Sequence, residues 1–396
     1  METGSQTQYF KLEEARDQLG DRVDYYWQAL HQMDPLADDA VAALATLPVD
    51  QSAKILDTTL KGSIEKDSTK KGSTEAIADI PDVPEALTAL LDHMAHVPWW
   101  VNWDSIDRGG QLCRQMALPI MLLLGFYALP ATYTSPAGNK PLVSTRYFVD
   151  RAPLRLAETL SFVRLTCAPN SLRPSNPGFR IHLKVRLMHA QVRRLLLRSG
   201  RWKVEEWALP INQAHMAGTL VAISANVFQK LKDLGFRFSA QEIEDVLHLW
   251  RYAGYLSGVR EALLCSTLGD ARMLTNLILS VEGAPDQDSR ALMKALRNIS
   301  RPPGGLEKPS WLANLRSSLV RVLLGDAIAD SLAIPKVKER FFWPPVLWGL
   351  SVIYWVLFRV PGGRSLAEWI GKLVWGRTEG ILFSMARKAR RRRERA

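Results

Sequence analysis

The chain shows apolar residues at intervals of three and four along most of its length, a spacing typical of α-helices. Clear alternation of apolar and polar residues, the pattern of a strand, is hard to find. Residues 9–48 predict two helices that are separated near Asp34-Pro35. From about Asp50 to Ala76 the sequence is polar and repetitive, so we expect a solvated loop or an insertion with little to bury.

The remaining pattern divides the chain further. Residues 84–284 are densely apolar with few long interruptions, and Pro302-Pro303-Gly304-Gly305 predicts a break before a C-terminal helical section. We therefore expect an all-α protein built as one large helical domain. The expected parts are N-terminal helices in residues 1–49, a polar loop or insertion in 50–80, a core in 81–300 and a C-terminal helical section in 301–396.

Two uncharged stretches raise the question of a membrane. Ala117–Leu129 is short for a span and predicts a buried core helix. Phe341–Phe358 has 18 uncharged residues between Arg340 and Arg359. It could span a membrane, lie at a membrane surface or be an internal helix, and Pro344-Pro345 weakens the first alternative.

Charge is concentrated at one end of the chain. Of the formal net charge of +11, six units belong to the basic tail of residues 387–396, so the folded body is only mildly basic. This distribution argues against a nucleic-acid partner. The tail either binds an anionic membrane surface from the cytoplasmic side or is a basic end without a specific partner. The 3 cysteines form no CxxC pair, and charged residues near the N-terminus exclude a signal peptide, so we expect a cytoplasmic protein.

The sequence has no GxGxxG, Walker, HExxH or GxSxG motif, so hydrolytic and nucleotide-dependent functions lack support. Histidines on apolar helices remain. On the helix expected over residues 179–198, His189 shares a face with Arg186 and Arg193, and His182 lies two turns away. Such an imidazole can hold a haem iron while the guanidinium groups pair with propionates. The alternative is a histidine that is simply buried in the core.

A second predicted helix begins at Asp150, which can cap it, with Pro153 in its first turn. Arg155 and Thr159 lie on one face together with Glu158 and Phe162. Burying this face would cost desolvation free energy unless a polar group lies against it. The alternative is that Arg155 and Glu158 form an ion pair on the protein surface. His215 begins another helix, whose small residues suit packing against either a flat macrocycle or a neighbouring helix.

Six segments in order carry a resemblance to a known family. They are Asp34-Pro-Leu-Ala-Asp38, Pro98 to Gly109, Arg155-Leu-Ala-Glu-Thr159, Gly178 to Arg193, Leu209 to Thr219 and Leu249 to Val259. The chain resembles the family of the latex clearing proteins (rubber oxygenases) and the MpaB-type oxygenases. The resemblance implies an all-α fold that binds haem b and uses dioxygen to cleave carbon–carbon double bonds of isoprenoids.

The resemblance also assigns roles. His189 resembles the proximal iron ligand, and Arg155 and Thr159 resemble the family's distal-side residues, which would hydrogen-bond dioxygen. Glu158 stands where rubber oxygenases have a lysine, and Ala137–Lys140 lacks the carboxylate that the family has in this region. Glu158 is the candidate replacement acid or base, and His182 or His215 could take the iron's other axial position. We expect a haem-dependent oxygenase acting on a hydrophobic isoprenoid-like or lipid substrate; the alternative is a non-catalytic membrane-associated protein with a degenerate site.

Overall fold

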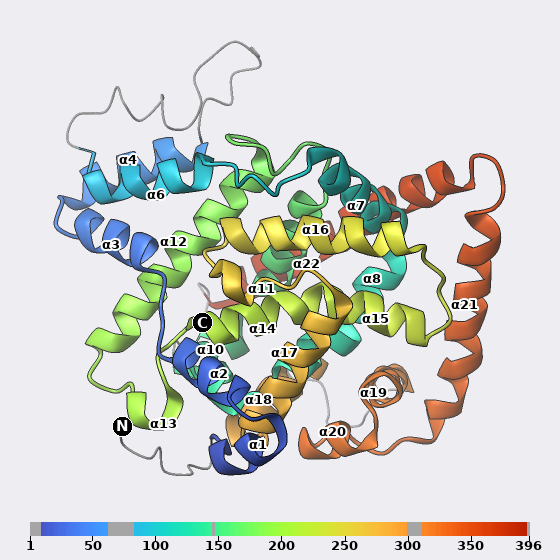
Figure 1. The fold of residues 1–396 in the computed structure, drawn as a ribbon. Helices are drawn as coiled ribbons and strands as arrows, with labels where there is room; N and C mark the ends of the chain where they lie inside the picture. Colours follow the sequence, from blue (N-terminus) through green and yellow to red (C-terminus); the bar gives the residue numbers. More distant parts are fainter. Residues whose placement is uncertain (1–8, 62–82, 145–146, 299–310, 394–396) are drawn as a thin grey trace.

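The structure is a computed structural model, and it describes residues 9–61, 83–144, 147–298 and 311–393 (Figure 1). Within these ranges the chain is helical, and its only β-type pairing is an isolated bridge between Phe10 and Glu282. The prediction of an all-α fold is therefore confirmed.

The helices follow the chain in three groups. The first comprises α1 (Leu12–Leu19), α2 (Arg22–Leu30), α3 (Pro35–Leu44), α4 (Val49–Lys61), α6 (Glu85–Ala95), α7 (Trp103–Gln115), α8 (Ala117–Leu123), the π-helix η1 (Leu124–Ala128), α9 (Leu129–Thr132) and α10 (Pro136–Ser144). The second comprises α11 (Tyr147–Thr166), α12 (Pro177–Arg198), α13 (Val204–Trp207), α14 (Gln213–Ile223), α15 (Ala225–Asp233), α16 (Ala240–Leu256), the 3-10 helix η2 (Glu261–Leu263), α17 (Leu268–Val281) and α18 (Gln287–Asn298). The third comprises α19 (Trp311–Leu324), α20 (Asp326–Ser331), the 3-10 helix η3 (Lys338–Phe342), α21 (Trp343–Leu357) and α22 (Gly363–Arg393).

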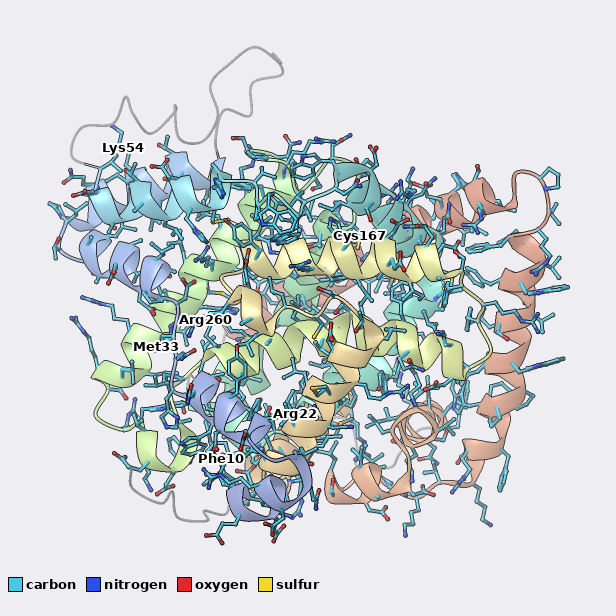
Figure 2. The ribbon with its side chains drawn as sticks, viewed as in Figure 1. Phe10, Arg22, Met33, Lys54, Cys167 and Arg260 are labelled. Atoms are coloured by element: carbon cyan, nitrogen blue, oxygen red, sulfur yellow. The ribbon has the colours of Figure 1, made fainter. Side chains whose placement is uncertain are left out.

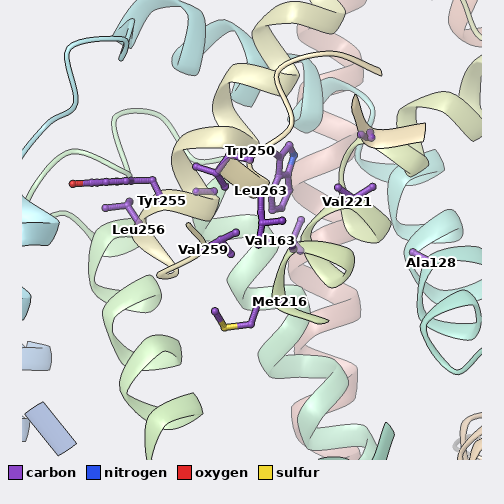
Figure 3. Close-up of a cluster of buried hydrophobic side chains, with 14 of the residues drawn as sticks. Ala128, Val163, Met216, Val221, Trp250, Tyr255, Leu256, Val259 and Leu263 are labelled. Carbon is purple, nitrogen blue, oxygen red and sulfur yellow. The ribbon is translucent and has the colours of Figure 1, made fainter. Parts of the chain in front are cut away.

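The main hydrophobic core gathers side chains from helices far apart in the sequence. Figure 3 shows Trp250 of α16 among Val163 of α11 and Val221 of α14, all of them buried. α16 packs along α7, and side chains fill the space between the ribbons throughout the molecule (Figure 2). Helices α11, α12, α14 and α16 thus share one core, and this core fixes the positions of the candidate site residues.

Local sequence signals explain several helix starts. Asp34 caps α3 by accepting a hydrogen bond from the Ala37 amide, and Pro35 stands in the first turn. The predicted break at Asp34-Pro35 is therefore confirmed, although the residues before it form two helices, α1 and α2, that are separated at Gly20. A capping box of Ser239 and Glu242 starts α16.

Two expectations about helix boundaries are wrong. The polar segment that begins near residue 50 is helix α4 as far as Lys61, because Ile55 and Thr59 form a buried stripe one turn apart. The rest of that segment, residues 62–82, lies outside the described residues. Asp150 does not begin its helix, because α11 starts three residues earlier at Tyr147 and holds Pro153 in its interior.

The two uncharged stretches lie in different environments. Most of the segment over Ala117–Leu129 belongs to the core, as predicted for a buried helix. Among the described residues, no single helix is long and apolar enough to cross a membrane. One bent pair, Trp103–Gln115 with Ala117–Thr132, meets the criteria of length and composition with a 79° angle between its halves.

Residues 287–298 form α18, and the predicted Pro-Pro-Gly-Gly break lies outside the described residues.

Candidate functional site

The candidate site lies between α11 and α12, which pack against each other. α12 carries His182, Arg186, His189 and Arg193, and α11 carries Arg155, Glu158 and Thr159. Near the ends that face the connecting loop, the Thr166 hydroxyl lies 3.1 Å from Nε2 of His182. The structure thus brings together the two helices that the sequence singled out.

His189 has an imidazole that is held neutral and left without a partner. Neither ring nitrogen makes a hydrogen bond within the described part of the chain, and Nδ1 is fully buried. Burial, together with the positive charges of Arg193 and Arg155, lowers the pKa of His189 to about 4. The ring is therefore neutral at pH 7, which is the form that ligates a metal ion.

Arg186 and Arg193 form two ion pairs between α12 and α3. The Nε and Nη2 atoms of Arg186 lie 2.6 and 2.8 Å from the two carboxylate oxygens of Asp34, and both side chains are buried. The Nε atom of Arg193 lies 2.8 Å from Oδ1 of Asp38, and its Nη1 donates to the Ile211 carbonyl oxygen. These contacts fix α12, and hence His189, against α3.

Each of these two arginines keeps one buried terminal nitrogen, Nη1 of Arg186 and Nη2 of Arg193, without a hydrogen-bond partner among the described residues. An unsatisfied buried donor is uncommon because it costs free energy. Their role toward a cofactor stays a prediction. The structure shows that most of each guanidinium group is already bonded to protein atoms.

The α11 residues differ in exposure. Arg155 is half-buried, and burial lowers its pKa while the nearby carboxylate of Glu158 opposes this effect. Arg155 is also close enough to His189 to lower the pKa of that imidazole. Glu158 and Thr159 are exposed. Arg155 thus acts electrostatically on His189 from the neighbouring helix, whereas the catalytic roles of all three residues stay predictions.

The other two candidate histidines, His182 and His215, have partners for both ring nitrogens. His182 is fully buried, with Nδ1 2.8 Å from the Ser257 hydroxyl and Nε2 beside Thr166, and burial lowers its pKa to about 3. In His215, Nε2 lies 2.8 Å from Oε1 of Glu282, and Nδ1 lies 3.0 Å from the side-chain nitrogen of Asn212. Of His182, His189 and His215, only His189 has no hydrogen-bonded ring nitrogen.

Glu282 is a buried carboxylate that the sequence analysis missed. It binds His215 and accepts hydrogen bonds from Tyr26, at 3.3 Å, and from Ser135, at 3.0 Å. Ser135 directly precedes α10, the helix that contains the segment Ala137–Lys140. A carboxylate distant in sequence thus approaches the segment that lacks one of its own. The available signal was an isolated acid directly after the apolar helix α17.

The donor set between α11 and α12 fits haem b. A neutral histidine with a buried, unbonded nitrogen on one helix could ligate the haem iron. Arg155 on the neighbouring helix and the two buried guanidinium nitrogens of α12 are cationic donors suited to anionic groups. His189 would hold the iron, and Arg186 and Arg193 would each have one free donor to offer a propionate.

Comparison with known proteins shows the family to which this fold belongs. The family described as "ER-bound oxygenase mpaB/B'/Rubber oxygenase, catalytic domain" matches residues 113–352. A rubber oxygenase of Streptomyces sp. (strain K30) is 24% identical over 270 residues, which are 66% of this chain and 65% of that protein. The match therefore spans slightly less than two thirds of that relative's length.

The fold is similar to a solved structure of the latex clearing protein LCP in its closed state. The TM-score is 0.62 at 20% identity, with 90% of this chain and 91% of the other covered. The match to the family covers more than half of the chain and includes both helices of the candidate site. This chain belongs to the family of MpaB-type and rubber oxygenase catalytic domains.

Proposed function

We propose that this protein is a haem-b-dependent oxygenase that uses dioxygen to cleave or oxidise a carbon–carbon double bond of a hydrophobic isoprenoid-like or lipid substrate. The observation that carries the proposal is His189, a neutral imidazole to which the described residues offer no hydrogen-bond partner, on a helix that packs against the helix of Arg155. A bound haem would supply the activation of dioxygen. Membership of the oxygenase family supports the reaction class.

The residues around the site have distinct tasks in this proposal. His189 would hold the cofactor, and the ion pairs with Asp34 and Asp38 would keep its helix in place. Arg155 is a cationic donor whose desolvation strengthens its interaction with negative charge that develops on an oxygen atom. Thr159, one turn further along α11, would offer a hydroxyl group from the same helix.

Purification of the full chain with haem supplementation tests the cofactor. We expect one b-type haem per chain by the pyridine haemochrome assay, and loss of the Soret band in His189→Ala. His31→Ala is the control because His31 is exposed and lies outside both site helices. If His189→Ala keeps full haem with an unchanged spectrum, His189 is not the ligand.

Activity is tested separately, with oligoisoprenoids and unsaturated lipids, under 18O-labelled dioxygen. We expect carbonyl products that carry the label, and loss of product in Arg155→Gln with haem retained. A haem-loaded protein that consumes no dioxygen with any of these alkenes would favour the non-catalytic alternative, for which the absence of a carboxylate in Ala137–Lys140 is the specific observation.

A further inference from the structure

α21 is a surface helix with an inverted pattern of polarity. A surface helix of a soluble protein normally buries its apolar side and exposes its polar side. In α21, the residues that face the protein are Leu347, Ser351 and Tyr354. The two polar members of this stripe, Ser351 and Tyr354, are the only polar side chains from Phe341 to Phe358. The exposed side of the helix is therefore entirely apolar.

The exposed apolar side chains are large. Phe341 is 80% exposed, Trp348 66% and Ile353 60%. The other large exposed members are Phe342, Val346, Val352, Trp355 and Val356. Figure 1 shows that α21 forms one edge of the molecule. A contiguous apolar face of this kind marks an interaction surface, because water does not favour it.

The charges next to this face are those of arginines. The guanidinium groups of Arg359 and Arg237 lie 4.0 and 5.9 Å from the ring centre of Trp355. Within the described part of the chain, neither arginine has a carboxylate partner at ion-pair distance. Arg364 lies over Phe358 at 4.4 Å, and Arg340 lies beside Phe341. Arg364 and Arg340 are also ion-paired, with Glu242 and Asp326 respectively. Arg237 and Arg359 therefore carry the uncompensated positive charge beside an aromatic ring, a combination suited to the headgroup region of an anionic bilayer.

The helix is too short to cross a bilayer. Its 15 residues extend about 22 Å at 1.5 Å per residue, against a hydrocarbon thickness of about 30 Å. Pro344 and Pro345 occupy its first turn, where backbone amides lack helical partners, and each proline removes one such amide. The helix can therefore lie in the membrane surface with few unsatisfied donors at its exposed start.

We propose that the outward face of α21 docks this protein onto an anionic lipid bilayer, with the helix in the plane of the surface. The apolar side chains from Phe341 to Val356 enter the acyl boundary, and Arg237 and Arg359 contact lipid phosphates. This inference does not depend on the proposed function, because it rests on a surface remote from His189 in sequence.

Vesicle flotation of the full-length protein tests the inference. We expect the protein to float with vesicles of phosphatidylcholine and phosphatidylglycerol in equal parts, and less with phosphatidylcholine alone. Trp348→Ser with Ile353→Ser should weaken partitioning by at least about tenfold, since each large side chain contributes more than that on full transfer. Arg237→Gln with Arg359→Gln should weaken binding only to the anionic vesicles, as should high salt.

Leu195→Ser with Leu279→Ser is the matched control, because these leucines are 62% and 53% exposed elsewhere on the surface. Circular dichroism checks that every variant is folded. The inference is overturned if the intact protein floats with neither vesicle, or if the α21 variant floats as well as the control. It is also overturned if removing residues 388–396 alone abolishes flotation, or if the α21 face instead mediates a dimer that the serine variant dissolves.

Discussion

The ion pair between Arg186 and Asp34 is expected to hold the histidine-bearing helix, and Asp34→Asn tests this expectation. Both side chains are almost fully buried, at 3% and 4% exposure, and are joined by two hydrogen bonds. Removing one charge of a buried pair leaves the other uncompensated, which costs about 3–5 kcal/mol. Loss of the helix cap at Ala37 adds little, because asparagine is also a good N-cap residue.

The assay is urea unfolding followed by circular dichroism, on the wild type, on Asp34→Asn and on Asp39→Asn. Asp39 lies on the same helix and is exposed, so its substitution should change the unfolding free energy by less than about 0.5 kcal/mol. In a double-mutant cycle, Arg186→Met should cost much less when Asp34 is already asparagine. The reasoning is refuted if Asp34→Asn lowers the unfolding free energy no more than Asp39→Asn does. It is also refuted if the effects of Asp34→Asn and Arg186→Met are additive.

Three further predictions follow from individual contacts. Burial lowers the pKa of His182 to about 3, so as the pH falls the unfolded chain binds a proton at this residue before the folded chain does. The contribution of His182 to the unfolding free energy is therefore complete above pH 6.5 and should fall by about 3 kcal/mol between pH 6.5 and 4. His182→Gln should remove this pH dependence in urea titrations. Gly258→Ala should lower the melting temperature and the haem content, because Gly258 has φ +81° and an added Cβ would lie 2.2 Å from Asp34 Oδ2. Gly200→Ala is the control, because Gly200 has φ +65° but open space around it. Glu158→Gln should leave the unfolding free energy within about 0.5 kcal/mol of wild type, because Glu158 is exposed, and should leave the haem open to imidazole in spectral titrations.

Local signals predicted much of the fold. Helix periodicity with the break at Asp34-Pro35 located the start of α3, because caps, prolines and spacing act within a few residues. α4 was missed because polar residues surround its buried stripe at Ile55 and Thr59. The start of α11 was misplaced because Pro153 is tolerated in its interior, where a first-turn position was expected.

The candidate site was predictable in its residues and not in its contacts. The periodicity that set His189, Arg186 and Arg193 on one side of a helix holds in the structure. Their partners Asp34 and Asp38 are more than 150 residues away, and only the packing of α3 on α12 brings them together. The direction in which α21 faces was equally beyond the sequence, because a helix that is apolar all round carries no pattern to orient it.

The outward face of α21 and the site helix α11 are connected through α22. α21 leads through a short turn into α22, and α22 packs along α11, the helix that carries Arg155 and Thr159. The contact is specific: Glu379 of α22 accepts a hydrogen bond from Nε of Arg164 at 2.8 Å and another from the Ser161 hydroxyl. α22 also approaches α7 at Gly371, where a Cβ would lie 2.3 Å from the Arg114 carbonyl oxygen, so its position has little freedom. A bilayer bound at α21 would therefore lie at a fixed orientation to α11 and its candidate site residues. A substrate dissolved in the lipid could then pass from the bilayer to the site without crossing water.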